Sequence, residues 1–431
     1  MATRRTARAR PLTGAVQVPG DKSISHRALI VASLAPGRSI VSHANTGADV
    51  RATATALTQL GAGVSFGEGE SQVLIEGCGY ERLHEPEAVI DAGNSGTTLR
   101  MLLGVCAALP ALSVLTGDES LRRRPMLRLV VPLRQMGATI DGRAHADRAP
   151  MVVRGGGLRG VDHELSIASA QVKSALLLAG LRADGMTSVR EPRASRDHTE
   201  RMLAAAGVGV ERDDLRVAVR GGEVPAAGQW RVPGDLSSAL FLVVAALLIP
   251  GSDLTVTGVG LNPTRTAALD ALRSMGASLE VEEEGDVCGE PVGSIRARHS
   301  ELRGTTIGPE AVPRLIDEIP ALVVAATQAD GTTEIRGAGE LRVKESDRIA
   351  TMAEGLSAIG GRVETLPDGL VVTGPSVLRG GEVDSRADHR VAMALAVAGL
   401  IATDRVRVAG WSSVETSFPE FLDVLGEAQR K

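Results

Sequence analysis

Residues Gly20–Ala35, GDKSISHRALIVASLA, join a polar opening to a long apolar run. The turn Pro19-Gly20 precedes the apolar run, and Pro36-Gly37 ends it. This pattern predicts a buried helix whose first turn carries charged and hydroxyl side chains. The first turn of a helix presents unpaired N–H groups and the positive end of the helix dipole, so it favours anions. A single copy would equally fit an ordinary capped helix.

The polar-start pattern occurs six times, and a turn and a β-rich run follow it. The six copies begin at Asp21, Asn94, Ser169, Asp235, Asp317 and Asp388. The segment VPGD at Val18–Asp21 recurs letter for letter at Val232–Asp235. A second helix pattern ends in glycines 66 to 84 residues apart, at Gly61, Gly137, Gly207, Gly276, Gly360 and Gly426. We expect these glycines to cap helices in the left-handed conformation, and the period predicts six α/β units rather than a solenoid.

The composition excludes several classes of protein. Hydrophobic residues make up 43% of the 431 residues and aromatic residues only 2%, so the cores must consist of Ala, Val, Leu and Ile. A net charge of −5 and the scarcity of aromatic side chains argue against nucleic-acid binding. The longest apolar run, Ala239–Ile249, is too short to cross a membrane. Three cysteines without a CxxC motif fit a reducing compartment, and we expect a cytoplasmic protein.

Lysine is rare in this chain. Of the 47 basic residues, only Lys22, Lys173, Lys344 and Lys431 are lysines. A lysine ammonium is a compact charge with an adjustable pKa, which a guanidinium cannot replace. The three internal lysines all lie in polar motifs, GDKS, SAQVK and RVKESDR. We therefore expect each of them to need something beyond positive charge.

Other motifs receive ordinary interpretations. GGGLRG at Gly155–Gly160 has the spelling of a dinucleotide-binding loop, but no helix pattern follows it. His198 and Glu200 form H-x-E without the PCxxC of zinc deaminases, and the eight histidines lack metal-ligand spacing, so we expect no metal. We expect the acidic stretch Glu280–Glu290 to be a solvated loop and the basic run Met1–Arg10 to be a disordered tail.

Taken together, the motifs resemble the 3-phosphoshikimate 1-carboxyvinyltransferase (EPSP synthase) family. The motifs are GDKSISHR, GNSGTTLR, RRRPM, SAQVKSA, RVKESDR and DHRVAMALAVAG, and the resemblance extends from about Leu12 to Leu425. The spellings RDHTE at Arg196–Glu200, SAQVK and NPTR at Asn262–Arg265 are similar to the second class of the family, which includes glyphosate-tolerant members.

The resemblance implies a two-domain inside-out α/β barrel with six repeated βαβαββ units, three per domain, and buried parallel helices. The chain would cross twice, giving a discontinuous domain of residues 1–20 and 234–431 and a second domain of residues 21–233. The helix N-termini of both domains would face the inter-domain cleft, which is the implied active site. This would focus positive potential locally in a protein of negative net charge.

The implied substrates are shikimate 3-phosphate and phosphoenolpyruvate, with no nucleic acid or membrane as partner, and we expect a monomer. Carried over by motif, the residues for shikimate 3-phosphate are Lys22, Ser23, Arg27, Ser169, Ala170, Gln171, Arg196, Asp317 and Lys344, with Ser195 as a weaker candidate. The residues for phosphoenolpyruvate are Lys22, Asn94, Gly96, Arg124, Gln171, Arg348 and Arg390. Guanidinium groups suit the carboxylate and phosphate of this substrate because they bind such groups in bidentate fashion.

The implied reaction joins the 5-hydroxyl of shikimate 3-phosphate to C2 of phosphoenolpyruvate and then eliminates phosphate. A proton must leave the hydroxyl, and a proton must reach the methylene carbon. The resemblance assigns the first transfer to Asp317 as the base. It assigns the second to Glu345, with Lys22 nearby. No metal or organic cofactor is implied.

Three positions bear on the family pattern. Many members carry lysine before the final T-F-P, whereas this chain reads Thr416-Ser417-Phe418-Pro419, so one phosphate contact is missing or is supplied otherwise. Ala170 replaces a serine of many members, and we expect Arg196 to compensate. Gly96, which tolerant members often replace, is retained, so the level of glyphosate tolerance stays open.

Two alternatives remain. UDP-N-acetylglucosamine carboxyvinyltransferase shares the fold, but it usually begins with a Lys-Asn pair and carries a loop cysteine. In this chain Ser23 follows Lys22, and no cysteine lies near Arg122–Pro125. The second alternative is a non-catalytic anion-binding protein on the same scaffold, against which the intact Asp317, Glu345 and Lys22 argue.

Overall fold

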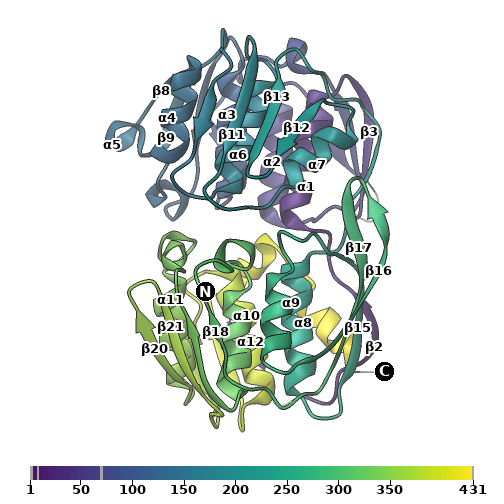
Figure 1. The fold of residues 1–431 in the computed structure, drawn as a ribbon, viewed down its shortest axis with the longest axis vertical. Helices are drawn as coiled ribbons and strands as arrows, with labels where there is room; N and C mark the ends of the chain where they lie inside the picture. Colours follow the sequence, from purple (N-terminus) through teal and green to yellow (C-terminus); the bar gives the residue numbers. More distant parts are fainter. Residues whose placement is uncertain (1–2, 7–8, 68–70, 430–431) are drawn as a thin grey trace. The chain divides into compact units, whose positions relative to one another are not determined.

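The structure, a computed structural model, describes residues 3–6, 9–67 and 71–429. The chain divides into two units (Figure 1). Unit 1 comprises Met1–Pro19, Pro233–Asp286 and Pro291–Lys431, and unit 2 comprises Gly20–Val232 and Val287–Glu290. The chain thus passes between the units after Pro19, after Val232 and on both sides of Val287–Glu290. The last two passages were not predicted.

The described residues of unit 2 form three four-stranded sheets. From one edge to the other, the first sheet consists of β14 (Gln229–Arg231), β3 (Gly37–Ser42), β5 (Val73–Gly77) and β4 (Gly63–Phe66). In the same spatial order, the second consists of β6 (Ile90–Asp91), β7 (Leu112–Thr116), β9 (Arg148–Arg154) and β8 (Thr139–Gly142). The third consists of β10 (Asp162–Glu164), β11 (Met186–Arg190), β13 (Arg216–Arg220) and β12 (Val210–Asp213).

Within its described part, unit 1 also forms three sheets, one of them three-stranded. The first consists of β16 (Ser278–Val287), β17 (Glu290–Arg298), β15 (Asp253–Gly260) and β2 (Thr13–Gln17). The second consists of β18 (Thr306–Ile307), β19 (Gly331–Ile335), β21 (Gly369–Gly374) and β20 (Arg362–Leu366). The third consists of β1 (Thr3–Thr6), β23 (Val406–Ala409) and β22 (Gly381–Asp384). The six sheets confirm the prediction of six α/β units.

Each repeat contributes one helix that is almost entirely buried. These helices are α1 (Lys22–Leu34), α3 (Gly96–Ala107), α6 (Ala170–Gly180), α8 (Leu236–Leu248), α10 (Ile319–Gln328) and α12 (His389–Ile401). The partly exposed helices of the repeats are α2 (Ala48–Gln59), α4 (Leu127–Met136), α7 (His198–Ala205), α9 (Ala267–Ser274), α11 (Arg348–Ala358) and α13 (Phe421–Ala428). Within unit 1, α8, α10 and α12 lie side by side (Figure 1). All six polar-start helices are therefore confirmed.

Parallel strand pairs determine where these buried helices begin. The parallel pairs β6–β7, β10–β11, β18–β19 and β22–β23 enclose α3, α6, α10 and α12 along the chain. In the other two repeats, β2 pairs with β15 and β14 with β3, and the helix before the second strand, α8 or α1, follows a passage between the units. A helix that connects parallel strands runs back along the sheet, so its N-terminus lies at the carboxyl end of the preceding strand. The polar motifs stand at these ends.

Four of the six buried helices begin with a side-chain cap. Asp21, Ser95, Asp235 and Asp388 accept hydrogen bonds from backbone N–H groups in the first turns of α1, α3, α8 and α12. The helices α6 and α10 lack such a cap, although Ser169 and Glu318 occupy their N-cap positions. Asp317, which begins the fifth polar-start copy, is therefore not the N-cap residue of α10.

Five of the six glycines predicted to cap helices have positive φ angles, from 83° at Gly207 to 114° at Gly137. Gly426 is the exception, and that prediction is wrong because the glycine lies inside α13. Phe421 and Leu425 of this helix are buried in the core of unit 1. Their burial outweighs the cost of about 1 kcal/mol for a glycine in a helix.

The prediction of a disordered tail at residues 1–10 is wrong for Thr3–Thr6. These residues form β1, which pairs antiparallel with β23. β1 takes the place that β21 and β9 hold in their sheets, beside the second strand of the parallel pair. The expectation for Met1, Ala2, Ala7 and Arg8 lies outside the described residues.

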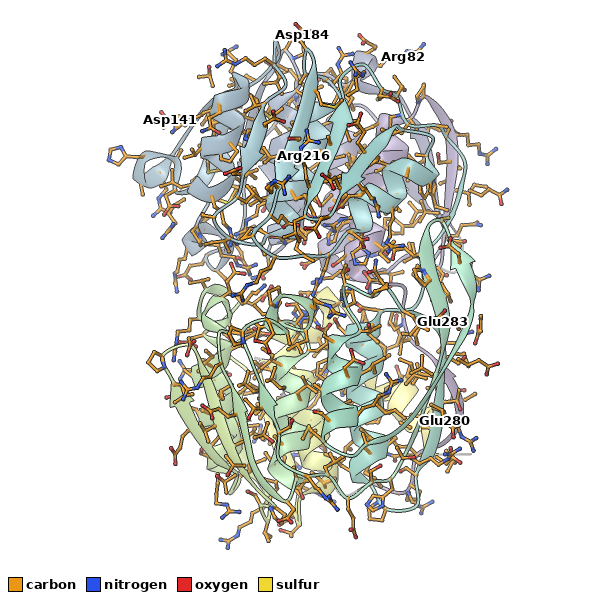
Figure 2. The ribbon with its side chains drawn as sticks, in the orientation of Figure 1. Arg82, Asp141, Asp184, Arg216, Glu280 and Glu283 are labelled. Carbon is orange, nitrogen blue, oxygen red and sulfur yellow. The ribbon has the colours of Figure 1, made fainter. Side chains whose placement is uncertain are left out.

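The acidic stretch Glu280–Glu290 was expected to be a loop, and that prediction is wrong. The stretch belongs mainly to the hairpin of β16 and β17. Residues 282–286 are exposed, and the side chains of Glu280 and Glu283 lie along this hairpin (Figure 2). Strand formation and solvation are compatible because an exposed strand still satisfies its backbone through its neighbour. The tip holds Glu290, whose Oε1 lies 2.8 Å from Nδ1 of His198.

Candidate functional site

The helix starts of unit 1 gather charged side chains that are far apart in the sequence, which we call the unit 1 cluster: Asp317, Lys344, Glu345, Arg348, Asp388 and Arg390. Asp317 precedes α10, and Lys344 and Glu345 lie between η4 (Gly339–Val343) and α11. Arg348 begins α11, while Asp388 caps α12, whose first turn contains Arg390. Five of the six residues were site candidates from the sequence.

Arg348 is the centre of the unit 1 cluster. Its Nε lies 2.8 Å from Asp388 Oδ2, its Nη1 3.1 Å from Asp317 Oδ1 and its Nη2 2.5 Å from Glu345 Oε2. The side chain is only 1% exposed. Burial lowers the pKa of Arg348, but Asp388, Glu345 and Asp317 outweigh it, so the pKa is raised overall. A fixed cation thus orients two candidate catalytic carboxylates.

Asp317 has three cations around it. Besides Arg348, Lys344 Nζ and Arg390 Nε each lie 3.8 Å from its Oδ1, and Arg390 Nη1 donates to the Asp317 carbonyl oxygen at 3.4 Å. Burial lowers the pKa of Lys344, and the neighbouring Asp317 opposes this. The arrangement can bind an anion beside a carboxylate that accepts a proton.

Unit 2 gathers a second group at the starts of α1, α2, α6 and α7. Lys22 Nζ forms an ion pair with Asp49 Oδ2 at 2.7 Å, and both side chains are largely buried. Arg27 donates from Nε to Thr199 Oγ1 at 2.8 Å, from Nη2 to Ser174 Oγ at 2.9 Å and from Nη1 to the Ser23 carbonyl oxygen at 2.9 Å. Burial lowers the pKa of Arg27 to about 10, so it remains a cation at neutral pH.

Four residues proposed for phosphoenolpyruvate lie around the start of α3: Asn94, Gly96, Arg124 and Gln171. Arg124 Nη2 donates to Asn94 Oδ1 at 2.8 Å, and Gln171 Nε2 donates to Thr97 Oγ1 at 3.0 Å. A Cβ atom at Gly96 would lie 3.0 Å from Arg100 Nη1 and 3.1 Å from Arg124 Nη1. Glycine therefore lets two guanidinium groups approach the helix tip. Within the run RRRPM, Arg122 and Arg123 are exposed and Arg124 is buried, which separates surface charge from candidate ligand.

Ser169, Ala170 and Gln171, three of the residues proposed for shikimate 3-phosphate, form the start of α6. Ala170 is the first residue of this helix, and it presents no hydroxyl. Ser169 and Ser195 both contact the carboxylate of Glu191, from the backbone N–H and the hydroxyl respectively. Arg196 is half-buried and lies close enough to Arg27 to contribute to the lowering of its pKa. Compensation for the missing serine by Arg196 stays a prediction.

Several polar residues of these clusters were missed. Arg100 Nη1 donates to Gln171 Oε1 at 2.6 Å, although GNSGTTLR includes it. Asp49 and Asp388 pair with Lys22 and Arg348, and both flank a helix start, which was the available signal. Glu191 lies outside every recognised motif, so the sequence carried no signal for it.

The stretch Thr416-Ser417-Phe418-Pro419 provides packing rather than a cation. Thr416 Oγ1 donates to the Ser413 carbonyl oxygen, and the Phe418 ring lies 5.5 Å from that of Phe421. The Phe421 ring also lies 6.2 Å from that of Phe241. Phe418, Phe421 and Phe241 therefore form an aromatic cluster in the core of unit 1, which otherwise consists mostly of aliphatic side chains.

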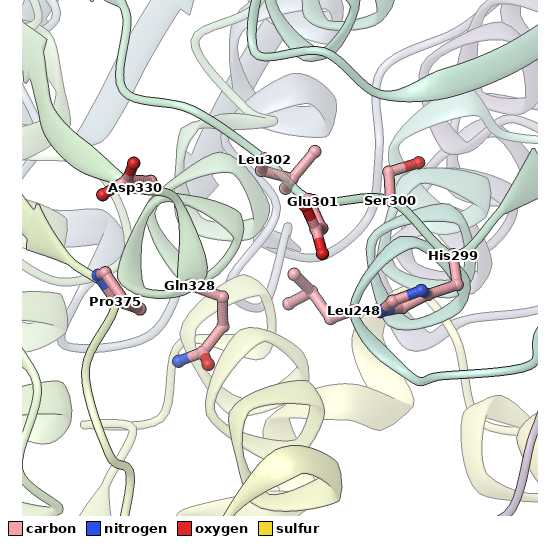
Figure 3. Close-up of a pocket in the computed structure, with 8 residues that line it drawn as sticks. All are labelled: Leu248, His299, Ser300, Glu301, Leu302, Gln328, Asp330 and Pro375. Atoms are coloured by element: carbon pink, nitrogen blue, oxygen red, sulfur yellow. The ribbon is translucent and has the colours of Figure 1, made fainter.

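Each unit contains a cavity lined by described residues. One of about 300 Å³ in unit 1 is lined by Leu248 and Gln328, at the carboxyl ends of α8 and α10, and by His299, Glu301 and Asp330 (Figure 3). The length of α10, about 15 Å, separates this cavity from Asp317. Another of about 510 Å³ in unit 2 lies between α4 and β10 and reaches Ser169. None of the residues that line the unit 1 cavity is a candidate site residue.

Over the described ranges 3–6, 9–67 and 71–429, none of the helices has the length and apolar character needed to span a bilayer. The same residues contain no group of three or more His, Cys, Asp or Glu side chains that could hold a metal ion.

The model of the EPSP synthase (3-phosphoshikimate 1-carboxyvinyltransferase) family matches residues 7–425. The chain belongs to this family. It is 54% identical over 424 residues to the 3-phosphoshikimate 1-carboxyvinyltransferase of Gloeobacter violaceus, covering 98% of both chains. It is 52% identical to that of Pelotomaculum thermopropionicum, covering 97% of both.

Solved structures support the family and the fold. The EPSP synthase of Acinetobacter baumannii is 41% identical, with a TM-score of 0.87 over 99% of this chain and 98% of that one. The enolpyruvyl transferase NikO of Streptomyces tendae is 18% identical, with a TM-score of 0.80, and shares the fold. The resemblance read from the motifs and the predicted inside-out α/β fold with six repeats are thus confirmed.

Proposed function

We propose that this member of the family transfers the carboxyvinyl group of phosphoenolpyruvate to the 5-hydroxyl of shikimate 3-phosphate and releases phosphate, a step of aromatic amino-acid biosynthesis. The observation that carries the proposal is the unit 1 cluster. There Asp317 lies among Lys344, Arg348 and Arg390, and Arg348 also holds Glu345. Two carboxylates and three cations are what a proton-transferring site for anionic substrates requires.

Shikimate 3-phosphate is assigned to Lys22, Ser23, Arg27, Ser169, Gln171 and Arg196 of unit 2 and to Asp317 and Lys344 of unit 1. Arg27 supports this assignment because burial beside three oxygen acceptors fixes its guanidinium at the start of α1. The backbone of Ala170 contributes the N–H group of a helix start. Both units would then act on one substrate.

Phosphoenolpyruvate is assigned to Lys22, Asn94, Gly96, Arg124 and Gln171 of unit 2 and to Arg348 and Arg390 of unit 1. The guanidinium groups of Arg124, Arg348 and Arg390 match its carboxylate and phosphate. Gly96 supports the assignment because the guanidinium groups of Arg100 and Arg124 lie so close to its Cα that an added Cβ atom would force them to shift.

In the proposed reaction, Asp317 takes the proton of the 5-hydroxyl group while the hydroxyl oxygen attacks C2 of phosphoenolpyruvate. Glu345 delivers a proton to the methylene carbon, which gives a tetrahedral intermediate. The Glu345 carboxylate then takes a proton from the new methyl group as phosphate departs, which restores the double bond. The scheme uses no metal or organic cofactor. We place the enzyme in the cytoplasm as a monomer.

Phosphate release tests the function. The purified chain is incubated with phosphoenolpyruvate and either shikimate 3-phosphate or UDP-N-acetylglucosamine. We expect release with shikimate 3-phosphate alone. Release only with the sugar nucleotide would favour the sister enzyme, and binding of anions without release would favour a non-catalytic protein.

We expect Lys22→Arg to lower kcat/KM about tenfold or more, although the charge is kept. Lys22 Nζ lies 2.7 Å from Asp49 Oδ2, and the two side chains are only 12% and 10% exposed. A planar guanidinium does not fit this position and cannot serve two substrates as a point charge. The measurement is the initial rate of phosphate release.

Arg38→Lys is the matched control for Lys22→Arg. Arg38 and Glu76 are 3.8 Å apart in the same unit, and both side chains are more than half exposed. This exchange should leave the rate unchanged. An unchanged rate in the Lys22 variant as well would show that the scarcity of lysine carries no functional meaning.

A further inference from the structure

Lys173 is the internal lysine that the proposed function leaves without a role. It lies in the first turn of α6, where a cation opposes the helix dipole. Its Nζ lies 2.7 Å from Glu191 Oε2 and 2.8 Å from Glu200 Oε1, and all three side chains are at most 5% exposed. Burial lowers the pKa of Lys173, but Glu200 and Glu191 outweigh it and raise the pKa overall. Lys173 is therefore a fixed cation within a buried triad.

The carboxylate of Glu191 has two different sides. Its Oε2 accepts from Lys173. Its Oε1 accepts from the backbone N–H of Ser169 at 3.0 Å and from the hydroxyl of Ser195 at 2.6 Å. One buried carboxylate thus joins the N-cap residue of α6 to the loop that carries Arg196. Both of these segments hold candidate ligands of shikimate 3-phosphate.

These contacts decide which groups remain for a ligand. Ser195 gives its only hydrogen to Glu191, so in this arrangement it cannot donate to a phosphate. The Ser169 side chain makes no capping bond to its own helix. Its hydroxyl and the first N–H groups of α6 are therefore donors that the start of this helix can offer to a phosphate.

The triad is also tied to Arg27. Glu200 belongs to the first turn of α7, next to Thr199, which accepts from Arg27 Nε and donates to Ser174 Oγ at 2.7 Å. Two glutamates and one lysine carry a net charge of −1, and Glu200 acts on Arg27 electrostatically. The triad therefore connects the starts of α1, α6 and α7.

We propose that Glu191, held by Lys173, is a positioning residue that sets Ser169 and the start of α6 for the phosphate of shikimate 3-phosphate. The inference rests on the proposed function for the identity of the ligand. It also explains the lysine at position 173, because a single Nζ donates to two carboxylates in a closed space that a guanidinium would overfill.

The test variant is Glu191→Gln. The new amide offers one oxygen and one NH₂ group to three donors, so either Lys173 or the pair Ser169 and Ser195 must face a donor. We expect the KM for shikimate 3-phosphate to rise about tenfold, with the KM for phosphoenolpyruvate changing less than about twofold. Calorimetric titration with shikimate 3-phosphate alone should show the same tenfold loss of affinity.

Tyr80→Phe is the matched control because it removes a buried hydrogen bond at the other end of α6. Tyr80 Oη donates to the Leu178 carbonyl oxygen at 2.7 Å. Both variants should lower the melting temperature, but only Glu191→Gln should change the affinity for shikimate 3-phosphate. Equal effects of the two variants on that affinity, or no effect of Glu191→Gln, would overturn the proposal.

Glu191→Asp keeps the test decisive if the glutamine variant does not fold. It retains the charge opposite Lys173 but shortens the side chain, so it cannot reach all three donors. We expect a smaller rise in the KM for shikimate 3-phosphate, and an unchanged KM would refute the positioning role. Binding of shikimate 3-phosphate by the wild-type chain without turnover would reject the proposed function, while the comparison of affinities would still decide the role of Glu191.

Discussion

Replacing Asp317 with asparagine should reduce kcat for phosphate release about 1,000-fold while the substrates still bind. Asparagine has the same shape but cannot accept the proton of the 5-hydroxyl. The change also removes one negative charge from a group of three cations, at 3.1 Å from Arg348 and 3.8 Å from Lys344 and Arg390. The affinity for the anionic substrates should therefore stay equal or increase, which calorimetric titration measures.

Asp330→Asn is the control for Asp317→Asn. Asp330 follows the carboxyl end of α10, whereas Asp317 precedes its N-terminus, and Asp330 is exposed. The same chemical change at the far end of the same helix should leave kcat unaltered. If Asp317→Asn kept more than about a tenth of the wild-type kcat, the 5-hydroxyl proton would have another acceptor.

The second large effect concerns stability. Arg348→Met should lower the free energy of unfolding of unit 1 by about 3–5 kcal/mol, because it leaves buried carboxylates without their cation. Arg348 is 1% exposed and contacts Asp388, Glu345 and Asp317. Since the carboxylates raise the pKa of Arg348, the cation persists at every pH below that value, and the wild-type contribution is not lost as pH rises through the neutral range.

Urea denaturation with a probe in unit 1 measures the effect of Arg348→Met, because a chain with two units need not unfold in one step. Arg348→Lys should fall between wild type and Arg348→Met, since one ammonium cannot reach three carboxylates. Arg296→Met removes the contact with Asp253, in which both side chains are about two-fifths exposed. It should cost less than about 1 kcal/mol. Equal losses for Arg348→Met and Arg296→Met would mean that burial of the cluster has no energetic weight.

The sequence was sufficient for the helices because their signals are local. Asp21 and Asp388 cap helices that begin within their motifs, and the apolar runs that follow are buried. Gly61 and Gly137 follow the ends of helices with positive φ angles, which glycine adopts readily because it has no Cβ atom. Gly426 has the same spelling, but its helix continues because packing of Phe421 decides the outcome.

Contacts between distant segments were not predictable from the residues alone. Asp317 and Arg390 are 73 positions apart, and only the resemblance to a family placed them in one site. Glu191 could not be found because its role comes from Lys173 and Ser169, which no motif connects to it. The strand β1 was missed since its partner, β23, lies about 400 residues away in the chain.

The pairing of β1 with β23 and of β2 with β15 has a consequence for biosynthesis. A nascent chain emerges from its N-terminus, and domains fold as their residues become available. Gly20–Val232 supplies nearly all of unit 2 in one continuous segment, so that unit can form while translation continues. Thr3–Thr6, although made early, must wait until Val406–Ala409 has left the ribosome. Chaperones that shield a stalled chain should therefore contact unit 1 far longer than unit 2.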